Sequence, residues 1–256
     1  YKYTSGDDQY KGGLIFNRDL TIIGPATIDG SGLARIFGVV GGHTLKLVNL
    51  NIINGFNDSY GAGLYTDGSN LIIDNCNFTG HTIRNVIDYF AWGSAIYAVD
   101  SNVSIDNSRF ERNWFTGTNG TSTVCCYGTT LNISNCLFKD NRAINYTAGV
   151  FYYNTSKGKI VNSNFTQNVL TGDDLYQSGA VYWYGPNAYL ENCTFTENKG
   201  KSGGAVVIFD KNGTINRCTF IGNTAYEGGA VAIFGTTTFC INGSYFKKNS
   251  AQFSGA

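Results

Sequence analysis

The sequence has 256 residues, of which 33 are glycine and two are proline, and only 14% of them are charged. The 18 basic residues balance the 18 acidic ones, which excludes the strongly cationic surface that nucleic acid or an anionic membrane would select. Few charges together with many Asn, Thr, Ser, Tyr and Phe residues favour strands and turns over helices. No apolar run reaches the roughly 18 residues of a membrane helix, so we expect any membrane anchor outside this segment.

In chain order, three regions are expected. Residues 1–19 form an N-terminal edge, residues 20–60 contain two degenerate coils, and residues 61–256 carry a repeated motif. The degenerate coils read DLTIIGPATIDGSG and TLKLVNLNIINGF. Because the chain starts and stops within this pattern, we interpret residues 1–256 as a single repeat domain cut from a longer surface protein.

The repeated motif contains a phenylalanine followed three residues later by asparagine in most copies. Its spacing varies from 25 residues, between Phe195 and Phe220, to 32 residues, between Phe78 and Phe110. Short motifs separated by inserts of variable length indicate a stacked array whose core repeats while its loops differ. The phenylalanine column consists of Phe78, Phe110, Phe138, Phe165, Phe195, Phe220 and Phe246.

Three residues before each phenylalanine the sequence favours a tight bend. Most copies have Asn there, as at Asn75, and one copy has Gly243 instead; both residue types tolerate a left-handed backbone. A small residue, Cys or Ser, follows the bend, and we expect these cysteines to be free, buried thiols. Like residues stacked ~4.8 Å apart are typical of a parallel β-helix. The prediction is an all-β solenoid of about nine coils; a β-sandwich, whose strands share no such motif, is the alternative.

A Gly-Ala block opens the other half of each coil. The aliphatic residue after it, such as Val124 or Val206, is expected inside, so that the next residue and the one two further on face outward. These outward columns predict an aromatic strip, and flat aromatic rings suit sugars. A protein partner or a second copy of the chain fits equally, and a loop lying over the strip is the competing hypothesis. The strip residues are Tyr65, Tyr97, Tyr127, Tyr153, Tyr182, Tyr184, Phe209 and Phe234.

Three inserts enlarge the loops before the Gly-Ala block: TIRNVIDYFAWG, WFTGTNGTS and VLTGDDLYQS. Stacked coils bring such loops to the same edge, where recognition often occurs. We therefore add Trp92 and Trp114 to the candidate ligand-binding residues. A stabilising flap is the alternative role for these inserts.

Two sequences, FTENKGKSGGAV and FIGNTAYEGGAV, carry the motif in its fullest form. Asp140-Asn141 and Gln167-Asn168 belong to looser copies. The combination resembles the repeats of the polymorphic outer-membrane protein family and of adhesin-like surface proteins of methanogenic archaea. LTIIGPATIDGSG also resembles the first coils of those adhesin-like proteins and of pectin-degrading enzymes. The resemblance covers residues 12 to 256. It implies a right-handed parallel β-helix, secretion or cell-surface display, and adhesion.

Catalysis on such a scaffold requires clustered carboxylates, and two small clusters are present. Asp74 and Asp106 fall in successive coils with Arg109 across the bend, and a lyase acting on acidic polysaccharide could use them with calcium. Asp173-Asp174 is the second candidate calcium site. A surface charge pair balanced by an arginine is the simpler interpretation of the first cluster. No further cofactor is expected, and whether the chain is an enzyme stays open, with the balance against it.

The sequence therefore predicts a non-catalytic, adhesin-like protein that is secreted or displayed on the cell surface. Its expected partners are glycans or surface proteins of another cell, with self-association also allowed. A polysaccharide lyase and a structural spacer or surface-layer repeat are the alternatives. If the chain is exported, its Asn-x-Ser/Thr sequons become acceptors for N-glycosylation. The candidate sites are Asn119, Asn132, Asn145 and Asn212.

Overall fold

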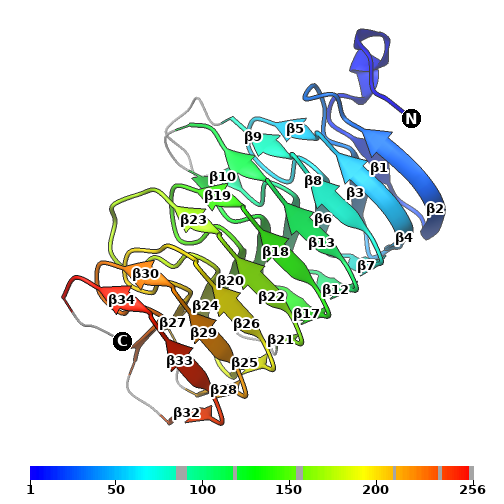
Figure 1. The fold of residues 1–256 in the computed structure, drawn as a ribbon. Helices are drawn as coiled ribbons and strands as arrows, with labels where there is room; N and C mark the ends of the chain where they lie inside the picture. The colour runs from blue at the N-terminus through cyan, green and yellow to red at the C-terminus, as the bar shows by residue number, and fades with distance from the viewer. Residues whose placement is uncertain (85–90, 118–119, 154–157, 210–211, 236–237, 254–256) are drawn as a thin grey trace.

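The computed structural model describes residues 1–84, 91–117, 120–153, 158–209, 212–235 and 238–253. The chain winds into a parallel β-solenoid of about eight turns, close to the nine expected. Successive coils stack into a rod with the two termini at opposite ends (Figure 1). A 3-10 helix, η1 (Ser5–Tyr10), precedes the first coil. No helix in the described ranges is long and apolar enough to cross a membrane.

Sheet 1 follows the Gly-Ala blocks and has nine strands, each paired in parallel with its neighbours in the adjacent coils. Like positions of the repeat stand opposite each other, as Val124 and Val150 do. Its strands are β1 (Leu14–Phe16), β3 (Phe37–Val40), β6 (Leu64–Asp67), β11 (Ile96–Val99), β16 (Val124–Tyr127), β20 (Val150–Tyr153), β24 (Val181–Tyr184), β27 (Val206–Phe209) and β31 (Val231–Phe234).

Sheet 2 has two arms that meet at the bend, joined through the long strands β2 (Leu20–Asp29) and β4 (Thr44–Ile53). The arm before the bend contains β7 (Asn70–Asp74), β12 (Asn102–Asp106), β17 (Thr130–Ser134), β21 (Gly158–Val161), β25 (Ala188–Glu191), β28 (Gly213–Asn216) and β32 (Phe239–Asn242). The arm after it contains β8 (Asn77–Thr79), β13 (Arg109–Glu111), β18 (Leu137–Lys139), β22 (Asn164–Thr166), β26 (Thr194–Thr196), β29 (Thr219–Ile221) and β33 (Tyr245–Lys247).

Short strands complete each coil along a third side, here called sheet 3. They are β5 (Phe56–Asn57), β9 (Thr82–Ile83), β14 (Trp114–Phe115), β19 (Arg142–Ala143) and β23 (Val169–Leu170), followed toward the C-terminus by the pair β30 (Thr224–Ala225) and β34 (Ser250–Ala251). The remaining pair, β10 (Ala91–Trp92) and β15 (Gly120–Thr121), belongs to the inserted loops.

The predicted bend between the two arms is confirmed. Asn75 has a φ of 51°, Arg217 a φ of 50° and Gly243 a φ of 57°, all in the left-handed region that asparagine and glycine tolerate best. The bend reverses which face the side chains present, so the alternation starts again beyond it. This is why the aliphatic residue two positions before the bend, such as Ile73, and the small residue directly after it, such as Cys76, both point inward.

The phenylalanine column forms the centre of the core. Consecutive rings from Phe78 to Phe246 stack with centroids 4.7–5.0 Å apart and interplanar angles of 5–10°. Burial of one such side chain contributes roughly 1.5–3 kcal/mol, so the column alone is a large part of the stability. The aliphatic column of sheet 1 faces the same core and is fully buried from Leu64 to Val206, as predicted.

The asparagine three residues after each phenylalanine forms a second, polar column inside the coil. The Nδ2 atom of Asn168 donates to the carbonyl oxygen of Phe138 at 2.9 Å and to Oδ1 of Asn198 at 3.0 Å. The same pair of contacts recurs along the rod, and we call this column the asparagine ladder. Its members are Asn113, Asn141, Asn168, Asn198, Asn223 and Asn249.

Candidate functional site

The predicted aromatic strip is divided into a covered part and an exposed part. In the first outward column, Phe151 and Tyr182 are only 3% and 6% exposed. Two loop residues cover them: the Trp92 ring lies 5.2 Å from that of Phe151, and Tyr146 packs edge-on against Tyr182 at 5.4 Å. Burial raises the pKa of Tyr182. The expectation that Tyr182 offers free surface is therefore wrong, because Trp92 and Tyr146 pack over this column, and Trp92 itself is half-buried.

The two ends of the strip are partly covered as well. Tyr97 lies between Tyr60 and Tyr65, with ring centroids 5.1 and 6.0 Å away, and it is half-buried. The Tyr65 hydroxyl donates to Asp67 at 3.2 Å. At the other end, Tyr176 from the third insert packs edge-on against Phe209 and Phe234 at 5.3 and 4.8 Å.

Three tyrosines at the ends of β16, β20 and β24 remain exposed. Tyr127, Tyr153 and Tyr184 are 48%, 37% and 43% exposed, and we call them the tyrosine ladder. Adjacent rings are nearly parallel, with centroids 5.0 and 4.6 Å apart. Since the rings face one another, a ligand meets their edges and hydroxyl groups. The expected packing of a sugar on a ring face does not fit this geometry.

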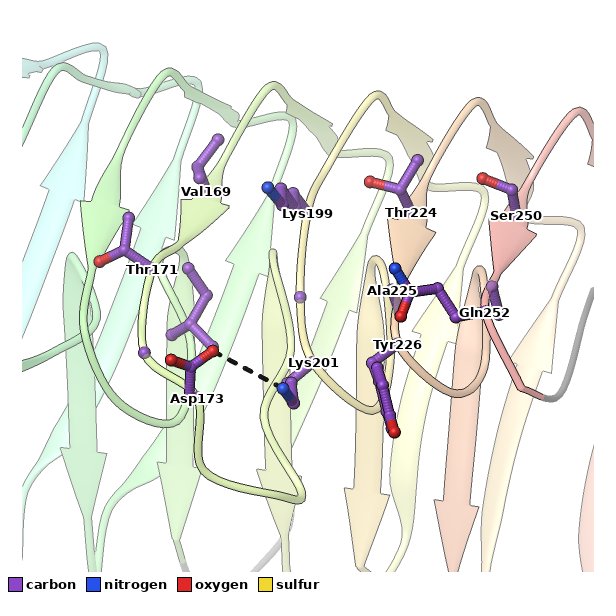
Figure 2. A pocket seen from close by; sticks show the side chains of 14 residues that line it. Val169, Thr171, Asp173, Lys199, Lys201, Thr224, Ala225, Tyr226, Ser250 and Gln252 are labelled. Carbon is purple, nitrogen blue, oxygen red and sulfur yellow. Dashed lines mark ion pairs between the residues drawn. The ribbon is translucent and has the colours of Figure 1, made fainter.

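A groove on the outward side of sheet 3 has a volume of about 670 Å³. It crosses four coils, and the third insert forms one wall. Figure 2 shows two rows of side chains along the rod. The upper row is Val169, Lys199, Thr224 and Ser250, and the lower row is Thr171, Lys201, Tyr226 and Gln252.

Lys201 occupies the middle of the groove. Its Nζ atom lies 3.6 Å from Oδ1 of Asp173 and 4.6 Å from the centre of the Tyr226 ring. The Lys201 side chain is 23% exposed, whereas that of Asp173 is 99% exposed. The sequence-based prediction did not include Lys199 and Lys201. Lys199 directly follows the motif asparagine Asn198, and Lys201 lies two residues further on, so the position of Lys199 could have identified an outward column.

Trp114 extends this outward column toward the N-terminus. It stands in register with Arg142, which in turn pairs with Val169. The Trp114 ring is 42% exposed, and the Arg142 guanidinium lies 5.6 Å from its centre. Trp114 therefore stays a candidate contact residue, on sheet 3 and away from the tyrosine ladder.

The carboxylates proposed for calcium or lyase chemistry are bound by other side chains. Asn107 donates its amide to Asp74 at 3.0 Å and to Asp106 at 3.1 Å, so the asparagine occupies the place between them. Asp74 and Asp106 are register partners in adjacent coils, as expected, whereas Arg109 pairs with Glu111 at 2.5 Å. Within the described ranges, no three His, Cys, Asp or Glu side chains are placed to hold a metal ion.

The second acidic candidate and the sequons occupy different surroundings. Asp173 pairs with Lys201, and Asp174 next to it is exposed. Asn145 is only 5% exposed and accepts a hydrogen bond from Gln177 at 3.2 Å, so burial makes it a poor glycan acceptor. The other sequon residues are Asn132, half-buried, Asn212, exposed, and Asn119, outside the described residues.

A family model of the right-handed β-helix region matches residues 26–185, well over half of the 256 residues. Comparison with curated proteins and with solved structures gave no match. The matched segment contains both the asparagine ladder as far as Asn168 and the tyrosine ladder. The parallel coils described above agree with this match, and the chain belongs to the right-handed β-helix family.

Proposed function

We propose that this chain is a non-catalytic, adhesin-like binding segment that is displayed outside the cell and recognises glycans of a partner surface. The exposure of three stacked tyrosines on a rigid sheet carries the proposal. Tyrosine is amphipathic, and buried rings of this size dominate binding interfaces. A protein gains little stability from leaving Tyr127, Tyr153 and Tyr184 between 37% and 48% exposed, so a binding role accounts for them.

The geometry of the tyrosine ladder favours an extended ligand parallel to the rod. Ring centroids 4.6–5.0 Å apart repeat the phenol hydroxyl at each coil. A linear glycan offers its own hydroxyl groups at regular intervals, and each phenol can both donate and accept a hydrogen bond. The sheet beneath is fixed by pairing on both sides, so little conformational freedom is lost on binding.

The resemblance of the Phe-x-x-Asn and Gly-Gly-Ala repeats to those of adhesin-like surface proteins supports the same function. The described carboxylates at the bend lie against asparagine amides, and nothing in their surroundings favours the lyase alternative.

The test is a glycan array probed with the purified chain and with two triple variants of Tyr127, Tyr153 and Tyr184. Replacement of all three by Ala should abolish binding. Replacement by Phe removes only the hydroxyls and should weaken binding by about tenfold or more. Tyr245→Ala, at an exposed tyrosine on β33, is the matched control. Full binding by the triple Phe variant would contradict recognition through the tyrosine hydroxyl groups. If the native chain bound no glycan on the array, the role of a structural spacer would be favoured.

A further inference from the structure

The groove on sheet 3 has a shape suited to a second, separate ligand. Residues of its upper row are in register from coil to coil, as Val169 with Lys199 and Lys199 with Thr224. Four coils spaced ~4.8 Å apart give a path of about 14 Å along the rod. The ligand is therefore an extended chain that lies across several coils.

The groove carries cations whose anionic partner is weakly held. Lys199 and Lys201 are its cations, and Asp173 is the carboxylate that lines it. The ion pair between Lys201 and Asp173 involves a carboxylate that is 99% exposed on the insert, and exposed ion pairs contribute little to stability. Asp173 thus occupies the position that a carboxylate of a ligand would take, and its displacement by that ligand would cost little free energy.

The rest of the lining suits a carbohydrate. Thr224, Ser250 and Gln252 have side-chain hydroxyl or amide groups that point into the groove, beside the apolar surfaces of Val169 and Ala225. A sugar chain presents both hydroxyls and C–H faces, and so matches this mixture.

The backbone of the same strands is already paired. The amides of Lys199, Thr224 and Ser250 donate to carbonyl oxygens of the preceding coil. An acidic peptide could not add to these strands by main-chain hydrogen bonds, as peptides do at open sheet edges. Recognition must therefore use side chains, which favours the glycan.

From these observations we infer that the groove of sheet 3 binds a linear glycan bearing carboxylates, with Lys201 pairing to one carboxylate after Asp173 is displaced. This site is separate from the tyrosine ladder and does not depend on the function proposed for it.

The test measures binding of a hexagalacturonate by calorimetry, with its methyl ester as the uncharged counterpart. The ester should bind about tenfold more weakly, and Lys201→Gln should weaken binding of the acid about tenfold as well. Asp173→Asn should tighten binding about threefold, because it removes the internal competitor. Lys139→Gln, at an exposed lysine on sheet 2, and the triple Phe variant of the tyrosine ladder should leave binding unchanged.

Several results would overturn the inference. They are equal affinity for acid and ester, no effect of Lys201→Gln, or no gain with Asp173→Asn. A glutamate hexapeptide that binds as tightly as the sugar would overturn the choice of a glycan. Loss of binding in the tyrosine variant would move the acidic ligand to the other site.

Discussion

The Nε2 atom of His81 lies 3.0 Å from the carbonyl oxygen of Ile52, and the Nδ1 atom of the same ring lies 3.0 Å from the amide nitrogen of Gly55. Asn113, one coil further along, makes the equivalent pair of contacts to Phe78 and to the amide of His81. His81 thus starts the asparagine ladder by reproducing its donor and its acceptor. The ring can do so only when it is neutral with the proton on Nε2.

This arrangement predicts a pH-dependent stability. Burial lowers the pKa of His81 from 6.5 to about 4, so between these values the unfolded chain binds more protons than the native one. The contribution of His81 is complete above pH 6.5 and is lost as the pH falls toward 4, by about 3 kcal/mol in all. Guanidinium unfolding of the native protein and of His81→Asn at pH 7, 5.5 and 4 measures this contribution.

His81→Asn should keep the ladder and remove this part of the acid sensitivity. The control is His43→Asn, at a partly exposed histidine 3.6 Å from Asp19, which should retain the full pH dependence of the native chain. Equal slopes for native protein and His81→Asn between pH 6.5 and 4 would show that the ring is not neutral and buried in solution.

A second prediction concerns the interior of the ladder. Asn168→Ala removes the partner of the Phe138 carbonyl oxygen and the acceptor for both the backbone and the side-chain amide of Asn141. Groups left buried without partners destabilise a protein, and we expect a loss of about 3 kcal/mol in the free energy of unfolding.

Two further variants define the cause of that loss. Asn168→Asp keeps the acceptor but buries a charge that faces two oxygen atoms. It should therefore lower the free energy of unfolding more than Asn168→Ala does. Asn164→Ala, at an exposed asparagine of the same coil, should stay within about 0.5 kcal/mol of the native chain. Similar losses at positions 164 and 168 would contradict a special role for the ladder.

The sequence predicted the coil far better than it predicted the surface. The phenylalanine column, the aliphatic column and the bend at Asn75 all follow from residue types at a fixed spacing. The inward position of Asn168 does not follow from residue spacing, because strand alternation would place a residue three positions after Phe165 on the opposite face. Gln167 adopts a left-handed φ of 55°, which turns the side chain of Asn168 back toward the core. Glutamine is not a residue type from which this backbone conformation would be predicted.

The aromatic strip illustrates the other limit. The sequence identified an apolar outward face but could not show which column the loops cover. Tyr146 and Trp92 lie over Phe151, and their placement depends on how the connections between sheet 3 and sheet 1 fold. Long-range contacts of this kind leave no periodic signal. The groove beside Lys201 was not predicted either, because one of its walls is formed by the third insert, although the column of Val169, Lys199 and Thr224 does follow the motif asparagines.

A third prediction tests why glycine recurs in the Gly-Gly-Ala block. A Cβ atom at Gly204 would lie 2.0 Å from the carbonyl oxygen of Gly229 in the next coil and 2.8 Å from the amide nitrogen of Thr224. Backbone atoms cannot give way without separating the coils, and we expect Gly204→Ala to lower the free energy of unfolding by about 3 kcal/mol. Gly12→Ala, where a Cβ meets open space, is the control and should be nearly neutral. Equal stability of the two variants would indicate that the coils are less closely stacked than described.

The last prediction concerns the seven cysteines, all of which are free thiols, six buried and one, Cys240, exposed. Thiolate formation in the core is unfavourable, and burial raises the pKa of Cys136 to about 12. A thiol reagent such as Ellman's should therefore label one cysteine per native chain within minutes and all seven in guanidinium. Cys240→Ser should eliminate the fast reaction, whereas Cys136→Ser should leave it intact. Fewer than seven thiols in the denatured, unreduced chain would reveal a disulfide. Cys193 and Cys218 are the first pair to examine, because they precede the register partners Thr194 and Thr219 of adjacent coils.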